Sequence, residues 1–464
     1  MKKIYFICLL VMSFSWGYAQ DESADEGLVY DNHVYVDYIK SVKFHIPGVV
    51  VSYPIINLGS GSLTLSFDDL DGDAKNYIYS IVHCDADWTP SDLTEMEYLD
   101  GFNEERIQET AFSFNSLTNY THHRITLPNE DLSFTKSGNY LLKVYDDEDD
   151  RFLVLTRRFM VVDPKFIVRA DVVLPSMVNK TKTHQEINFV IEHKGTRINN
   201  PRQEVNVVVM QNGRWDNALK KIQPQLIRPT SLVYELLDKV VFPAGKEFRF
   251  FDLRSLRYRG SGVKAIEEFD DGYDVTLLMD EMRAYSTYYE IRDLNGSFVI
   301  GNVDNGDRGV GFNLNTNNGS LNAGQREALE AAQVDILRQQ LIQNEQSNNL
   351  QGDYANVLFS LEMNEPFYDK DVYIFGELTD WQLKQEFKMT YQNVVNAYVA
   401  DVFLKQGYYN YIYATVPKKG KKIIDTSELE GNWFETENQY TILVYYRPFG
   451  ARYDRLMSAT TITR

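Results

Sequence analysis

Cysteine is nearly absent from this sequence. Its 464 residues include only two, Cys8 and Cys84, and Cys8 lies in an apolar N-terminal segment. If that segment is removed, no intramolecular disulfide can form, so stability must come from packed hydrophobic cores, which a chain of this length can supply. Cys84 ends a strand-like run, residues 77–84. We therefore expect a buried, unreactive thiol at this position.

Basic residues and long hydrophobic runs are also scarce. The chain carries 47 Lys and Arg against 66 Asp and Glu, which gives a formal net charge of -19. Such a surplus of negative charge repels phosphate backbones, so nucleic acid is not an expected partner. Beyond the N-terminal segment, no stretch approaches the roughly 20 apolar residues that a membrane-spanning helix needs. Membrane insertion is therefore not expected either.

The first residues have the pattern of a cleavable signal peptide. Lys2 and Lys3 precede an apolar run over residues 4–14, and Gly17 and Ala19 put small residues at the −3 and −1 positions of a cleavage site. We expect cleavage after Ala19, with cleavage one residue later as the less regular alternative. The apolar run is too short for a membrane anchor. The mature protein is therefore expected to be exported.

Strands are the dominant predicted element. Aromatic residues make up 13% of the chain, with 31 Tyr and 26 Phe, and this composition favours strands over helices. Short alternating or apolar runs separated by turn signals recur along most of the sequence. The predicted fold class is mainly β, with tandem antiparallel β-sandwich (immunoglobulin-like) domains and one helical, Asn/Gln-rich insertion.

The predicted organisation has six segments. They are a signal peptide (1–19), an N-terminal β-sandwich (20–163), a second β-sandwich (164–301), the insertion (302–352), an early-set immunoglobulin-like domain (353–447) and a C-terminal tail (448–464). Within the insertion, residues 325–346 lack Gly and Pro, and Val334, Leu337 and Leu341 recur at helical spacing. This predicts one helix, exposed to solvent because its other residues are polar.

Signatures of catalysis are missing. The sequence has no Gly-x-Ser-x-Gly, no His-Glu-x-x-His and no phosphate-binding glycine loop, and its seven histidines are scattered. His83, Asp85 and Asp87 share one strand face and could hold a metal, but a strand end with hydrogen-bonded carboxylates is the preferred interpretation. Alternating aspartates at 69, 71 and 73 lack the Gly and Glu positions of a calcium loop. We predict no enzymatic activity, no metal and no cofactor.

One series of motifs is far more specific than the composition. It comprises Tyr79-Ser80-Ile81-Val82-His83-Cys84-Asp85-Ala86-Asp87-Trp88-Thr89-Pro90-Ser91, Glu97-Tyr98-Leu99-Asp100-Gly101-Phe102, Leu127-Pro128-Asn129, Ser137-Gly138-Asn139-Tyr140, Arg158-Phe159, Tyr373 to Trp381 and Val444-Tyr445-Tyr446-Arg447. This series closely resembles the Plug protein family of the type IX secretion system of Bacteroidetes. The resemblance covers most of the chain apart from the insertion.

The resemblance implies a function and a partner. Members of that family are periplasmic and seal the periplasmic mouth of the outer-membrane type IX translocon barrel (SprA-type) when no cargo passes. Aromatics near turns commonly anchor interfaces, but Trp88 can equally fix its strand to the core. The family-motif residues are therefore predicted to serve either the core or an interface: His83, Cys84, Asp85, Asp87, Trp88, Pro90, Tyr98, Gly101 and Phe102.

A second function stays open at this stage. The run from Phe375 to Trp381, followed by Gly407-Tyr408-Tyr409-Asn410-Tyr411, looks like the early-set immunoglobulin modules that bind glycogen or accompany glycan enzymes. In those modules exposed Trp side chains stack on sugar faces, and Trp381 is the residue that could do so here. The alternative is thus an exported glycan-binding accessory protein, the one interpretation in which a glycan is a partner.

Overall fold

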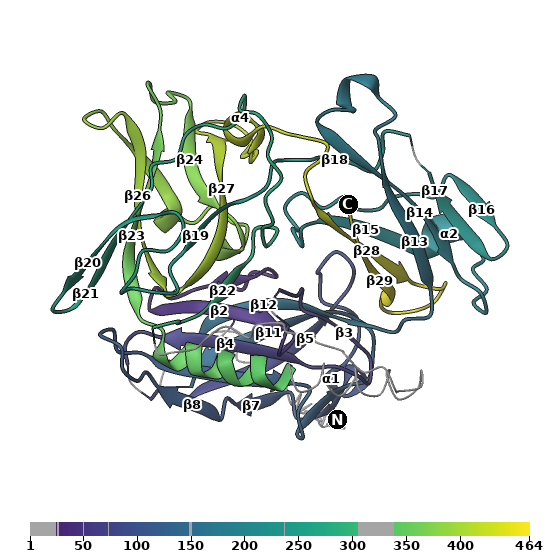
Figure 1. The fold of residues 1–464 in the computed structure, drawn as a ribbon. Helices are drawn as coiled ribbons and strands as arrows, with labels where there is room; N and C mark the ends of the chain where they lie inside the picture. Colours follow the sequence, from purple (N-terminus) through teal and green to yellow (C-terminus); the bar gives the residue numbers. More distant parts are fainter. Residues whose placement is uncertain are drawn as a thin grey trace, which may run out of the picture.

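The computed structural model describes residues 25, 27–49, 51–72, 74–147, 151–235, 237–304 and 338–464. The fold is mainly β, and most of its strand pairs are antiparallel, which confirms the predicted class. Figure 1 shows three β-domains, with the first at the bottom, the third at the upper left and the second at the upper right. The predicted signal peptide lies outside the described residues.

The first domain packs two sheets face to face. One has the order β1 (His33–Val34), β12 (Phe152–Val162), β11 (Gly138–Asp146), β5 (Tyr77–Cys84), β7 (Glu104–Arg106), with β3 (Ile55–Asn57) parallel to β12. The other has the order β2 (Ile39–His45), β4 (Leu63–Asp69), β9 (Thr121–Leu127), β8 (Glu109–Phe112). Between them lies an aromatic core in which Tyr140 and Phe159 stack at 5.2 Å. Two short pieces, α1 (Glu95–Tyr98) and the pair β6 (Leu99–Gly101) and β10 (Leu132–Phe134), close one end.

The second domain is completed by the C-terminal end of the chain. One sheet has the order β13 (Ile167–Val173), β14 (His184–Glu192), β17 (Ser231–Tyr234), β16 (Leu226–Arg228), with β18 (Val241–Pro243) beside β14. The facing sheet consists of β15 (Val205–Gln211), β28 (Gln439–Tyr446) and β29 (Arg455–Thr463). The residues of β28 share one buried core with β14 and β15. The short helix α2 (Pro201–Glu204) leads into β15.

The third domain takes strands from both sides of the insertion. Its strand order is β19 (Arg249–Asp252), β27 (Gly407–Pro417), β24 (Lys370–Phe375), β25 (Lys388–Gln392), β26 (Ala397–Lys405), β23 (Tyr354–Glu362), β21 (Gly272–Leu277), β20 (Val263–Phe269). A further strand, β22 (Phe298–Ile300), pairs with β27. The helix α4 (Ser427–Glu430) follows β27 and covers the end of the core.

These pairings differ from the predicted segments in two places. Residues 249–300, predicted within the segment 164–301, pair with strands of the third domain. Residues 439–446, predicted within the domain 353–447, and residues 455–463, predicted within the tail 448–464, form β28 and β29 of the second domain. The alternation of side chains along a strand identifies the strand and its buried face, but it does not identify the neighbouring strand. The chain therefore leaves the second domain, builds the whole third domain and returns.

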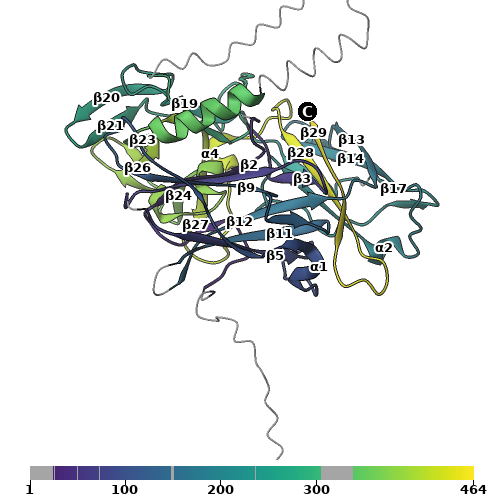
Figure 2. The same ribbon diagram turned by 90° about the horizontal axis from the view of Figure 1, so that it is seen from below.

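The predicted helix is present at its C-terminal end and is less exposed than expected. Residues 338–351 are helical, whereas residues 325–337 lie outside the described part. Arg338 Nε donates to the carbonyl of Pro47 at 3.1 Å, and Glu345 pairs with His45 of β2 at 2.7 Å. The helix consequently lies alongside the first domain, as both views show (Figures 1 and 2). No helix in the described ranges has both the length and the apolar character that crossing a bilayer requires.

Candidate functional site

The family motif at the end of β5 lies in the junction between the first and second domains. Trp88 is only 2% exposed, and its ring meets that of Trp215, from the second domain, edge to face at 5.1 Å. The guanidinium of Arg158 lies 4.4 Å above the Trp88 ring. The cluster around these rings is buried and apolar, and it draws on both domains: Cys84, Ala86, Leu141, Met160 and Val162 from the first, and Val208, Met210, Leu443, Tyr445 and Leu456 from the second.

Polar contacts fix the same junction. Asp85 accepts a hydrogen bond from the backbone N–H of Asp454 at 3.0 Å, and Asp454 accepts one from Ala86 N–H at 2.9 Å. Arg447 forms ion pairs with both carboxylates, at 3.1 Å in the case of Asp454. The hydroxyl of Tyr445 donates to Asn139 Oδ1 at 2.8 Å. The motif therefore contacts the segment between β28 and β29, which lies more than 350 residues later in the sequence.

His83 and Cys84 have no open side for chemistry. His83 is buried, with Nδ1 2.8 Å from Ser91 Oγ and Nε2 3.2 Å from the carbonyl of Ser137. Burial lowers the pKa of His83 to about 4 and raises the pKa of the Cys84 thiol to about 12. Both imidazole nitrogens of His83 are occupied by these hydrogen bonds, and the sulfur of Cys84 is protonated at neutral pH, so it is not prepared for nucleophilic attack.

The other polar motif residues fix a turn. Asp87 is exposed, and its Oδ1 accepts hydrogen bonds from the Thr89 hydroxyl at 2.6 Å and from the Thr89 N–H at 3.1 Å, which lower the pKa of Asp87. Pro90 is also exposed and forms an isolated bridge to Cys84. Among the described residues, no group of three or more His, Cys, Asp or Glu side chains could hold a metal ion. The face shared by His83, Asp85 and Asp87 is accounted for by these hydrogen bonds and ion pairs.

The last part of the motif divides between the core and the surface. Tyr98 is buried and donates from its hydroxyl to the carbonyl of Ile81 at 3.1 Å. Gly101 has φ of +118°, and a Cβ at this position would lie 1.9 Å from the carbonyl oxygen of Asp131. Phe102 is 74% exposed. The motif thus supplies interface, core and surface residues together.

A second junction, between the first and third domains, is built on a buried ion pair that sequence reasoning did not select. Asp68 of β4 lies 2.5 Å from Lys405 Nζ of β26. Asp68 also contacts His122 Nδ1 at 2.6 Å and accepts from the Tyr354 hydroxyl at 2.7 Å. Burial opposes ionisation of Asp68, but Lys405 and His122 outweigh it and hold its pKa below the ordinary value. No distinct sequence signal marks this pair, because Asp68 is followed by Asp69 at the end of β4 and Lys405 is the last residue of β26.

Lys405 makes two further contacts. Its Nζ donates to the carbonyl of Asn349 at 2.6 Å, and it lies 4.0 Å from the centre of the Tyr120 ring. Tyr120 in turn donates to the carbonyls of Asn349 and Gly352 at 3.0 and 2.8 Å. The C-terminal end of the insertion is therefore part of this junction.

Trp381, the alternative sugar-stacking residue, lies where the third domain meets the second. Its ring packs edge to face against Phe375 at 5.4 Å and Phe248 at 5.9 Å. Arg214, from the second domain, places its guanidinium 4.8 Å from the ring centre. The ring face that a sugar would need is thus occupied by an arginine.

The comparisons with known proteins agree with the motif series. Residues 39–163 match the family model described as type 9 secretion system plug protein 1st domain. The chain is also similar to a hypothetical protein from Parabacteroides merdae ATCC 43184, known from a crystal structure, with 33% identity and a TM-score of 0.81; the match covers 94% of the present chain and 99% of that one. No match to a curated protein was found.

The match of residues 39–163 indicates the general role of the chain. A protein with this domain has a role in type IX secretion, in association with the secretion translocon and in the periplasm or elsewhere in the cell envelope, and its family is not a known enzyme family. The resemblance seen in the sequence is thereby confirmed: the chain belongs to the plug protein family of the type IX secretion system.

Proposed function

We propose that the chain is a non-enzymatic periplasmic plug that binds the type IX translocon barrel and seals its periplasmic opening. The observation that carries the proposal is that the family-defining motif, through Trp88 and Asp85, joins two domains instead of lining a catalytic cleft. A seal needs a body whose faces keep their relative positions. The two buried junctions provide such a body.

The energetics of the junctions support this role. Removing one partner of a buried ion pair such as Asp68–Lys405 costs about 3–5 kcal/mol, because the other charge is left unpaired. Domains of one chain usually move relative to each other unless their interface is large and hydrophobic, and the junction around Trp88 is buried and apolar. A preassembled body loses little conformational freedom when it binds, which favours a contact that must form and release repeatedly.

The glycan-binding alternative gains no support from Trp381. Arg214 lies against its ring, and Phe375 and Phe248 pack on it edge to face, so the ring is engaged in contacts within the protein. Residues 353–464 do not form a complete domain, so titration of glucans has to use the full mature chain. Saturable binding that disappears in Trp381→Ala would restore the alternative.

The proposal is tested in the native outer membrane. A tagged chain should recover a very large outer-membrane barrel protein, and deletion of the gene should make the outer membrane leaky to periplasmic proteins. Complementation with the wild-type chain should restore the barrier. Recovery of glycan-utilisation proteins in place of the barrel, with an intact barrier in the deletion strain, would contradict the proposal.

A further inference from the structure

Three loops come together at one end of the third domain, and this end is called here the lysine end. The loops are residues 363–369, 393–396 and 418–424. Strand pairing places them together, because β24 begins opposite the end of β27, and the turn 393–396 joins β25 to β26, which starts beside the end of β23. β26 runs from here to Lys405 at the first domain, so its nine residues separate the two ends by about 30 Å. In Figure 1 the lysine end lies at the top, away from the first domain.

Backbone hydrogen bonds hold the three loops against one another. Lys418 N–H donates to the carbonyl of Asp369 at 2.8 Å. Met363 N–H donates to the carbonyl of Asn396 at 2.9 Å. The loops therefore form one continuous surface rather than three independent projections.

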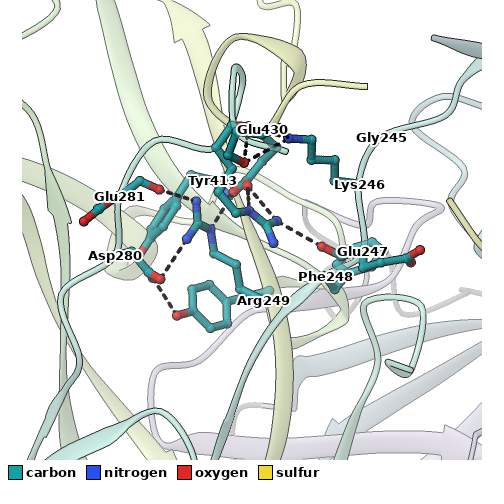
Figure 3. Close-up of polar contacts among 12 residues, drawn as sticks. Gly245, Lys246, Glu247, Phe248, Arg249, Asp280, Glu281, Tyr413 and Glu430 are labelled. Atoms are coloured by element: carbon teal, nitrogen blue, oxygen red, sulfur yellow. Dashed lines mark hydrogen bonds and ion pairs between the residues drawn. The ribbon is translucent and has the colours of Figure 1, made fainter. Parts of the chain in front are cut away.

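A buried charged network fixes the strand end from which the loop 418–424 leaves (Figure 3). Arg249 of β19 pairs with Glu430 at 2.9 Å and with Asp280 at 2.7 Å. Glu430 belongs to α4, which follows the loop, and its Oε1 accepts from the N–H of Tyr413 in β27 at 2.9 Å. The loop is thus anchored on both sides, at β27 and at α4.

Positive charge is concentrated at the lysine end. Residues 418–422 are Lys-Lys-Gly-Lys-Lys, and all four lysines are exposed. They form no ion pair within the part of the chain that the structure describes, whereas Lys370 beside them pairs with Glu428 at 2.7 Å. The three loops together carry these four lysines and only two carboxylates, those of Glu365 and Asp369, in a chain whose formal net charge is -19.

Apolar side chains are exposed on the same loops. Val394 is 95% exposed in the turn between β25 and β26, and Ile423 and Tyr368 are 56% and 80% exposed on the other two loops. Val178 in the second domain is just as apolar and nearly as exposed, but among the described residues only the lysine end combines such side chains with a run of four unpaired lysines. Lysines beside apolar side chains and a tyrosine are typical of surfaces that lie on anionic lipid headgroups.

The type of cation favours a lipid surface over a folded partner. The three loops contain no arginine, the residue whose planar guanidinium recognises a phosphate or carboxylate in one fixed geometry. Lysine is a point charge on a flexible stem, which suits headgroup phosphates that have no fixed positions. The acidic remainder of the chain is little obstacle, because salt screens its repulsion beyond about 10 Å.

We propose that the lysine end binds the surface of an anionic phospholipid bilayer. Its lysines contact the headgroup phosphates, and Val394, Ile423 and Tyr368 reach the boundary with the acyl chains. The contact is peripheral and involves no spanning segment. This inference goes beyond the proposed function and does not depend on it, because the ligand is the lipid surface itself.

The test is co-sedimentation of the full mature chain with vesicles of phosphatidylcholine and phosphatidylglycerol, and with vesicles of phosphatidylcholine alone. The wild type should bind only the anionic vesicles. Raising the ionic strength from about 0.1 M to about 1 M shortens the Debye length from about 10 Å to about 3 Å and should release it. Lys419→Gln/Lys421→Gln/Lys422→Gln should weaken binding about 100-fold, since each lysine near such a surface contributes roughly a factor of five.

A matched control changes the net charge equally at another place. It is Lys182→Gln/Lys239→Gln/Lys264→Gln, which removes three exposed lysines that also lack an ion pair within the described ranges. This variant should bind like the wild type, and because all six lysines are exposed, both triple variants should keep the wild-type unfolding curve.

The apolar contribution has its own pair of variants. Val394→Ser/Ile423→Ser should weaken binding to anionic vesicles at least about fivefold, because methyl groups are lost from the acyl boundary. Leu174→Ser/Val178→Ser removes two exposed apolar side chains from the second domain and should have no effect.

Four results would overturn the proposal. They are a wild type that does not bind anionic vesicles, a wild type that binds phosphatidylcholine vesicles equally well, equal binding by the two triple lysine variants, and displacement by inorganic phosphate at constant ionic strength. The last would assign the lysines to a free anion. If the wild type ignores vesicles but captures an acidic protein from detergent extracts through these lysines, the surface serves a protein partner and the proposal is likewise wrong.

Discussion

Asp68 and Lys405 lie 337 positions apart in the sequence, and their side chains meet at 2.5 Å between the first and third domains. Both are 1% exposed or less. His122 and Tyr354 complete the coordination of the carboxylate. One charge from each domain is thus neutralised only when the two domains are together.

Breaking this pair should be costly. We expect Asp68→Asn or Lys405→Met to lower the free energy of unfolding by about 3–5 kcal/mol, because each leaves a buried charge without its partner. The double variant Asp68→Leu/Lys405→Met should recover part of that loss. Removing the more exposed pair of Arg106 and Asp147 is the control and should cost at most about 1 kcal/mol. Thermal and urea unfolding measure all of these; equal effects of the buried and exposed pairs would contradict the assignment.

Trp88 and Phe102 belong to the same motif but differ in environment. Trp88→Ala should destabilise the protein by about 3–5 kcal/mol, because it leaves a cavity between Trp215 and Arg158. Phe102→Ala should change stability by no more than about 0.5 kcal/mol, since the ring is exposed. Unfolding curves and limited proteolysis of the two variants provide the comparison. A stable Trp88→Ala would mean that the junction does not depend on this ring.

The backbone conformation at position 101 requires glycine. Its φ of +118° and the carbonyl oxygen of Asp131, 1.9 Å from a built Cβ, leave no room for alanine. Gly101→Ala should therefore cost at least about 2 kcal/mol. Gly272→Ala is the matched control, because it lies in a strand with nothing within 4 Å of a Cβ, and alanine there should be neutral or slightly stabilising. Circular dichroism melting of both variants decides the point.

Cys84 should be chemically silent in the folded protein. The side chain is fully buried, and burial raises the pKa of its thiol to about 12. In the mature chain at pH 8, a thiol reagent should label well under one equivalent in buffer and one equivalent in urea. Rapid labelling under native conditions would place Cys84 in an accessible site.

Glu247 should make stability depend on pH. Burial raises the pKa of Glu247 to about 7, above its ordinary value of 4.5, and burial also raises that of Asp293 to about 6. Between pH 4.5 and about 7, the folded state therefore binds more protons than the unfolded state. The stability that Glu247 contributes is fully present below about pH 4.5 and is lost as the pH rises through about 7. The Glu247 contribution is up to about 3 kcal/mol.

Melting temperatures at pH 5 and pH 8 test this contribution. Glu247→Gln should flatten the decline without abolishing it, because Asp293 remains. Glu290→Gln, which removes an exposed carboxylate, is the control. If the decline is as steep in Glu247→Gln as in the wild type, this carboxyl group is not its source.

The sequence alone determined the local structure and the family. The run over residues 77–84 was recognisable as a strand because alternating and apolar residues pack on a pleated surface, and it is β5. The motif around Trp88 was recognisable because its residues stand together in the chain. Both signals are local, so they need no knowledge of the rest of the fold.

Only the tertiary structure decided which strands pair and which distant side chains contact each other. β15 pairs with β28, more than 200 residues later, and Trp88 packs against Trp215 instead of the core of its own domain. Strand patterns of the same period are interchangeable until the whole set of cores is packed, since a strand edge can pair with any other strand of suitable register. The position of Lys405 beside Asp68 followed from that packing, because long-range contacts depend on every domain at once and no short stretch of sequence encodes them.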